Sequence, residues 1–148
     1  MSAGADASAS MVLLLDTHVV LWAALNEGRL GRHATKAIGL ASRENRLAVS
    51  AITPWEIGQL AGKKRINLYR DVLEWVSDTL AKPGIALAPL EPEIAVASAC
   101  LPFEMHPDPA DRILVAAARH LGAILVTADQ ALLALAKKGY FRAMDAAK

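Results

Sequence analysis

A short apolar run that ends in an acid is the feature that most constrains the fold of this chain. Residues 12–15 read Val-Leu-Leu-Leu, and Asp16 follows at once. An uninterrupted apolar run of this length is typical of a strand buried on both faces, as in the centre of a parallel sheet covered by helices. Asp16 then marks the point at which the strand leaves the core.

The rest of the chain alternates short strands with longer helices. Further strands are expected over 46–51, 85–88 and 123–127, with a short edge strand over 141–144. Helices are expected over 17–26, 32–44, 54–61, 69–81, 91–100, 109–121 and 129–138. Parallel neighbours require crossover connections, and the crossover helices cover both faces of the sheet. We therefore predict a three-layer α/β/α sandwich around a mostly parallel sheet of four or five strands.

Length and composition indicate one soluble domain. The chain has 148 residues, of which 54% are hydrophobic, enough for a sizeable single core. We expect residues 11–148 to form that domain and residues 1–10 to form a flexible leader. The longest apolar stretch, 12–25, is interrupted by Asp16 and His18, so we expect no membrane span. The single cysteine suits a reducing compartment, so we expect a cytoplasmic location.

Charge and cysteine content exclude several classes of protein. Sixteen Lys and Arg residues against fifteen Asp and Glu give a net charge of +1, which argues against a basic protein that coats DNA irrespective of sequence. The single cysteine, Cys100, excludes an internal disulfide and a thiolate zinc cluster, and we expect it to be a buried helix residue. The four histidines lack the spacing of a zinc-binding helix.

Four acids are expected at one edge of the sheet. Asp16 ends the first strand, and Asp129 directly follows the fourth. Glu56 and Asp111 fall in the first turns of helices that begin at the same edge, because crossover helices run antiparallel to the strands. If the first and fourth strands are neighbours about 4.8 Å apart, their terminal carboxylates face each other.

Helix capping explains some of these acids singly. Residues 53–56 and 108–111 match capping patterns, and 127–130 form a possible third. Capping does not explain Asp16 at the end of a central strand. Carboxylates gathered closely repel one another unless some are protonated or a cation joins them, and hard oxygen ligands favour Mg²⁺ or Mn²⁺. For the cations that an anionic substrate needs, Arg112 is the first candidate and residues 63–65 the second.

Four segments of the chain together resemble a known family. They are Leu-Leu-Asp-Thr-His at 14–18, Ser-Ala-Ile-Thr-Pro-Trp-Glu-Ile at 50–57, His-Pro-Asp-Pro-Ala-Asp-Arg-Ile-Leu at 106–114 and Leu-Val-Thr-Ala-Asp at 125–129. In order and spacing, from residue 11 to about 144, the chain resembles the PIN-domain ribonucleases, especially the VapC-type toxins of toxin–antitoxin pairs.

The resemblance implies an activity, a site and partners. It implies a ribonuclease that uses Mg²⁺ or Mn²⁺ and leaves a 5′-phosphate and a 3′-hydroxyl. It also implies that the chain forms a homodimer and binds a cognate antitoxin. The implied catalytic and metal-binding residues are Asp16, Glu56, Asp111 and Asp129. Thr127 is implied as a supporting hydroxyl on the substrate side, and Asp108 and Thr17 as second-rank residues. Whether one ion or two bind, and which acid is the base, stay open.

Three other functions are alternatives. A receiver-like, Mg²⁺-binding phosphoacceptor domain needs adjacent acids after the first strand and a lysine after a later one, whereas this chain has Leu15-Asp16 and Thr127-Ala128-Asp129. A haloacid-dehalogenase-like phosphatase needs an acid where His18 stands. A non-catalytic binding module with the PIN fold is the third alternative.

Overall fold

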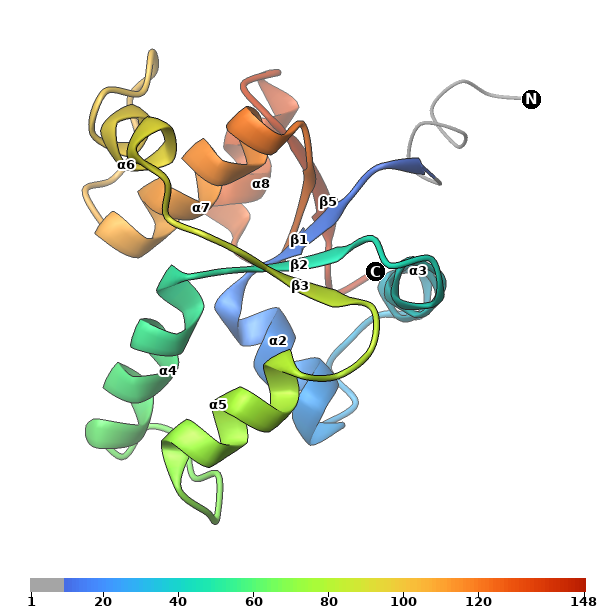
Figure 1. Ribbon diagram of the computed structural model, residues 1–148. Coiled ribbons are helices and arrows are strands. Elements are labelled where there is room, and N and C mark those ends of the chain that lie inside the picture. The colour runs from blue at the N-terminus through green and yellow to red at the C-terminus, as the bar shows by residue number, and fades with distance from the viewer. Residues whose placement is uncertain (1–9) are drawn as a thin grey trace.

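A computed structural model describes residues 10–148 and shows strands and helices in alternation (Figure 1). Nine of the ten residues of the expected leader lie outside the described range. The strands are β1 (Leu13–Leu15), β2 (Leu47–Ser50), β3 (Ile85–Ala88), β4 (Ile124–Thr127) and β5 (Arg142–Asp145). The helices are α2 (Thr17–Leu25), α3 (Arg32–Arg43), α4 (Ile52–Gly62), α5 (Val72–Leu80), α6 (Pro92–Ala99), α7 (Pro109–Leu121) and α8 (Gln130–Lys137).

The five strands form one parallel sheet in the order β3-β2-β1-β4-β5. The apolar run of β1 lies in the middle, with Leu13, Leu14 and Leu15 at most 3% exposed. β4 is its direct neighbour, and β3 is an edge strand. The predicted α/β/α fold is confirmed, and the carboxyl ends of β1 and β4 meet at the centre of one sheet edge.

Helices cover both faces of the sheet (Figure 1). Leu14 and Leu125 face a core shared with α6, α7 and α8, while Leu13, Leu15 and Val126 face a core shared with α2 and α3. A third apolar cluster joins α2, α4 and α5. This burial on both faces explains why β1 and β4 are continuously apolar. In the part of the chain that the structure describes, no helix is long and apolar enough to span a bilayer.

Three local expectations are wrong. The capping box at 53–56 is not formed, because α4 begins at Ile52 and the Thr53 hydroxyl lies 3.0 Å from that of Thr17. α5 begins at Val72 rather than at 69, since Asp71 caps it by accepting from the Glu74 N–H. Cys100 is exposed at the end of α6, where the helix stops one residue earlier than expected.

The turn before β3 depends on a glycine. Gly84 has a φ of +88°, and a Cβ added there would lie 2.1 Å from the carbonyl oxygen of Ser42. An L side chain therefore meets both backbone strain and a steric clash with α3. Gly58, in the interior of α4, is exposed and has open space around its Cα.

We predict opposite effects of the same substitution at these two glycines. Gly84→Ala lowers the free energy of unfolding by about 2 kcal/mol or more, because it adds strain and a backbone contact. Gly58→Ala raises it by about 0.5–1 kcal/mol, because alanine loses less backbone entropy in a helix. Urea denaturation of both variants measures the difference; equal effects would contradict this description of the β3 turn.

Candidate active site and metal centre

Asp16 lies at the junction of β1 and β4 and is 4% exposed. Its N–H donates to the carbonyl of Val126 at 3.0 Å, so the strand pairing extends through this residue. Its Oδ1 accepts from the Thr17 N–H at 2.7 Å, and its Oδ2 accepts from the Thr127 hydroxyl at 2.7 Å. The carboxylate is therefore held in place by the first residue of α2 and the last residue of β4.

Thr127 connects two of the predicted acids. While its Oγ1 donates to Asp16, the same oxygen accepts from the Asp129 N–H at 3.0 Å. Asp129 caps α8, and its Oδ1 accepts from the N–H groups of Ala131 and Leu132 at 2.9 and 3.1 Å. The backbone after β4 thus places both the hydroxyl and the second carboxylate beside Asp16.

Glu56 reaches the same edge from α4. The Thr17 hydroxyl donates to its Oε1 at 2.5 Å. Because one hydroxyl carries one proton, the Thr53 hydroxyl donates to Thr17 in turn. Burial raises the pKa of Glu56; the hydrogen bond from Thr17 opposes this shift, and the charges of Asp16 and Asp108 add to it.

Asp111 has a pKa far above the ordinary value of an aspartate. Asp108 caps α7 as expected, with its Oδ1 accepting from the Asp111 N–H at 3.1 Å. The Asp111 side chain is 18% exposed. Burial first, and then repulsion from Asp16, Asp108, Asp129 and Glu56, raise its pKa to about 7. The other three predicted acids therefore lie close enough to Asp111 for their charges to act on it.

Lysine and arginine do not neutralise this cluster. Among residues 10–148 no lysine or arginine is paired with its acids, and the basic side chains beside them are two histidines, His18 near Asp16 and His106 near Asp111, each at 3.4 Å. Arg112, the expected substrate contact, donates to the carbonyls of Ser98 at 2.8 Å and Met105 at 3.3 Å. Its guanidinium thus holds the segment that leads into α7.

The contacts of the two histidines with these acids do not follow from the sequence alone. His18 Nε2 accepts from the Ala128 N–H at 3.1 Å, so its ring proton lies on Nδ1, toward Asp16. Its spacing two residues after Asp16, at the start of a helix, was an available signal. His106 begins the segment 106–114 that carries the resemblance, but its contact with Asp111 depends on the irregular segment that Arg112 holds.

A divalent cation fits this site by charge and ligand type. The site offers carboxylate oxygens, and two of its acids have raised pKa values because burial and mutual repulsion disfavour their charged forms. Hard ions such as Mg²⁺ and Mn²⁺ take such ligands. Within residues 10–148, however, no three His, Cys, Asp or Glu side chains already converge as a closed ligand set.

This α/β protein has a cluster of acids at the carboxyl ends of its middle strands. Sequence comparisons identify its family. The family model described as PIN domain matches residues 13–138, so the chain belongs to the PIN-domain family. The chain is also 38% identical, over 120 residues, to Ribonuclease VapC22 of Mycobacterium tuberculosis. The match covers 81% of this chain and 88% of that relative.

Solved structures share the fold at low sequence identity. DNA-bound VapBC from Salmonella typhimurium matches with a TM-score of 0.63 and 18% identity, over 91% of this chain and 98% of that chain. VapBC-1 from nontypeable Haemophilus influenzae matches with a TM-score of 0.62 and 14% identity, over 93% of this chain and 100% of that chain. These similarities confirm the architecture that the sequence predicted.

The burial of Asp111, together with the repulsion from its acidic neighbours, predicts how stability depends on pH when divalent ions are absent. Between pH 3.8, the ordinary pKa of this carboxyl, and about 7, the folded protein holds a proton that the unfolded chain has released. The free energy of unfolding contributed by Asp111 therefore falls as pH rises through this range.

Asp111→Asn removes this penalty. In EDTA at about pH 8, we expect the variant to be more stable than the native chain by about 2 kcal/mol, or roughly 4–8 °C in melting temperature. The gain shrinks toward pH 5, where the native carboxyl is largely protonated. Thermal melts across this range measure the effect, and a gain that is the same at both pH values would contradict it.

Proposed function

We propose that this chain is a divalent-metal-dependent endoribonuclease and the toxin of a toxin–antitoxin pair. The observation that carries the proposal is the meeting of Asp16, Glu56, Asp111 and Asp129 at one sheet edge, with no lysine or arginine paired to them among residues 10–148. A relative named as a ribonuclease, at 38% identity, supports RNA as the substrate.

The four acids are the proposed ligands of Mg²⁺ or Mn²⁺. When bound, such an ion stabilises negative charge on the phosphodiester and lowers the pKa of water. Asp16 is the fixed ligand, because Thr17 and Thr127 hold both of its oxygens in place. Asp111 and Glu56 contribute carboxyls whose raised pKa values fall when a cation offsets their repulsion.

Glu56 is the proposed general base. The Thr17 hydroxyl holds its Oε1, so Oε2 has a defined direction and is the oxygen that would accept a proton. Asp129 uses Oδ1 to cap α8, which suits a ligand with a fixed orientation. His18 and His106 orient Asp16 and Asp111, and Arg112 positions the segment that carries His106.

The proposed partners are RNA, a cognate antitoxin protein and a second copy of the chain, in the cytoplasm. The structural neighbours are VapBC proteins, two of them described as bound to DNA. A non-catalytic module with the same fold is the alternative. Its acids would bind a cation without cutting RNA, so a cleavage assay separates the two functions.

Neutralising Asp16 tests the proposed chemistry. We expect the purified native chain to cut RNA with Mg²⁺ or Mn²⁺ and to stop in EDTA. Asp16→Asn lowers the cleavage rate by about 10³-fold or more, because it removes charge from the central ligand while keeping its shape. Gel analysis of RNA ends and urea denaturation of both proteins are the measurements. Cleavage in EDTA, or unchanged cleavage by the folded variant, would refute the proposed role.

A second pair of variants tests the hydroxyl that links two acids. Thr127→Val keeps the side-chain shape but removes the hydrogen bond to Asp16 and the acceptor for the Asp129 N–H. We expect a loss of about 10–100-fold in kcat/KM and weaker Mn²⁺ binding. Thr127→Ser retains the hydroxyl and should stay within a few-fold of the native chain. Equal losses in both variants would show that packing, not the hydroxyl, matters at this position.

A further inference from the structure

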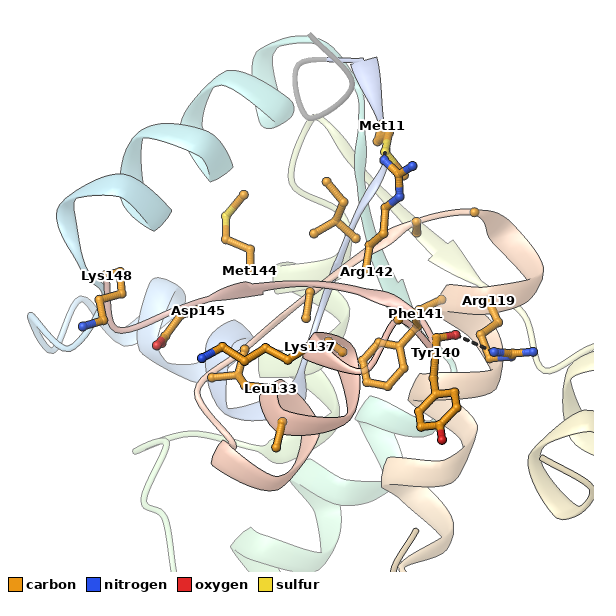
Figure 2. Close-up of a pocket in the computed structure, with 18 of the residues that line it drawn as sticks. Met11, Arg119, Leu133, Lys137, Tyr140, Phe141, Arg142, Met144, Asp145 and Lys148 are labelled. Carbon is orange, nitrogen blue, oxygen red and sulfur yellow. Dashed lines mark hydrogen bonds between the residues drawn. The ribbon is translucent and has the colours of Figure 1, made fainter. Parts of the chain in front are cut away.

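A broad groove of about 1190 Å³ follows β5, the edge strand on the side of β4. α8 forms one wall, and Met11 and His33 contribute from the opposite face of the sheet. In Figure 2, Arg119 and Tyr140 lie toward one end of the groove, and Asp145 and Lys148 toward the other. The groove is separate from the carboxylate cluster, and the proposed chemistry does not use it.

Charge in the groove is predominantly positive. Among its described lining residues, four are cationic, namely Arg119, Lys137, Arg142 and Lys148, and one is acidic, Asp145. None of these cations forms an ion pair with a described residue. Lys137 and Arg142 are exposed, and Arg142 donates to the weak acceptor Met11 Sδ at 3.2 Å. Their charges therefore remain available to an anion.

An aromatic pair lies at the end of the groove near Arg119. The rings of Phe103 and Tyr140 stack with centroids 4.2 Å apart and an interplanar angle of 13°. The Arg119 guanidinium lies 5.3 Å from the centroid of Phe103 and donates to the Tyr140 carbonyl. Tyr140 is 37% exposed, so part of its surface faces solvent beside the cations.

The other end of the groove reaches the carboxyl ends of the strands, where the four acids lie. Asp145 pairs in register with Thr127, whose hydroxyl bonds Asp16. Gln130, another lining residue, directly follows Asp129. A chain that lies in the groove therefore runs from the carboxylate cluster, past Lys137 and Arg142, to Tyr140.

We propose that this groove, defined by Lys137, Arg142 and Tyr140, binds the single-stranded RNA that flanks the bond to be cut. The inference rests on the proposed ribonuclease function and adds a subsite to it. Cations that follow a backbone and aromatic rings that stack bases are the combination that binds single strands without sequence preference. The groove also supplies positive charge that the acidic centre lacks.

An acidic peptide paired to β5 is the competing occupant. The edge strand is only four residues long and begins and ends with the charged residues Arg142 and Asp145. Short, charged edges disfavour strand addition. A peptide also gives no particular use to the stacked rings, whereas RNA uses both the cations and the aromatic surface.

Binding measured without divalent ions tests the groove independently of cleavage. The probe is a fluorescent oligouridylate about twelve nucleotides long, titrated with the full chain in EDTA at salt concentrations from about 50 to 200 mM. Lys137→Gln with Arg142→Gln should weaken binding about tenfold at the lowest salt. It should also reduce the slope of log affinity against log salt by about 1.4, since each lost phosphate contact contributes about 0.7.

Matched variants separate the groove from net charge. The control is the double variant Lys82→Gln with Arg43→Gln. It removes the same charge near β3, the outermost strand on the side of the sheet away from β5, and should change binding less than twofold. Tyr140→Leu should weaken binding about fivefold or more through lost stacking, while Tyr140→Phe retains it. Equal effects of the two charge pairs, no binding by the native chain, or displacement of RNA by an equally long glutamate peptide at equal concentration would each overturn the proposal.

Cleavage then distinguishes this inference from the proposed function. With Mn²⁺, the groove variants should lose about tenfold in kcat/KM on the long oligonucleotide and clearly less on a tetranucleotide, which makes fewer contacts along the groove. If the native chain binds RNA through the groove but cuts neither substrate, the ribonuclease proposal fails and the groove stands. If it cuts both and the groove variants match it on both, the groove proposal fails and the ribonuclease stands.

Discussion

Repulsion among carboxylates that the sheet forces together is the constraint on which the candidate site depends. Asp16 is fixed by the β1–β4 junction and is 4% exposed, so it has little freedom to move away from its neighbours. Burial first, and then the nearby charges of Asp16, Asp108, Asp129 and Glu56, raise the pKa of Asp111 to about 7. Such a cluster is poorly stable as a set of free anions and becomes stable when protons or a cation compensate it.

The polar groups around the acids orient them without neutralising them. Thr17 and Thr127 are buried hydroxyls that donate to Glu56 and Asp16, and the backbone amides at the start of α8 hold Asp129. These contacts keep the charge in place and leave its compensation to protons or a cation. Arg112, next in sequence to Asp111, contacts carbonyls and so adds structure rather than a counter-charge.

The sequence could predict the site residues that lie at the ends of strands. A buried apolar run that ends in Asp16, and an acid directly after β4, have few possible placements in a parallel sheet, and both lie where expected. The hydrogen-bond partners of the side chains could not be predicted as well from the sequence. The pattern at 53–56 matched a capping box, but a contact with Thr17, distant in sequence, determines where the Thr53 hydroxyl points. His106 and the β5 groove depend on irregular segments and on residues from α7, α8 and β5, which have no common sequence signal.

Calorimetric titration of the native chain with Mn²⁺ in buffers of different ionisation enthalpy tests the central claim most directly. If the ion compensates crowded carboxylates, binding should tighten as pH rises from about 6 to 8 and should release close to one proton per site at the lower pH, mainly from Asp111. Proton release should approach zero at the higher pH, where that carboxyl is already ionised. Binding that is independent of pH and releases no proton, or no binding at all, would contradict the account.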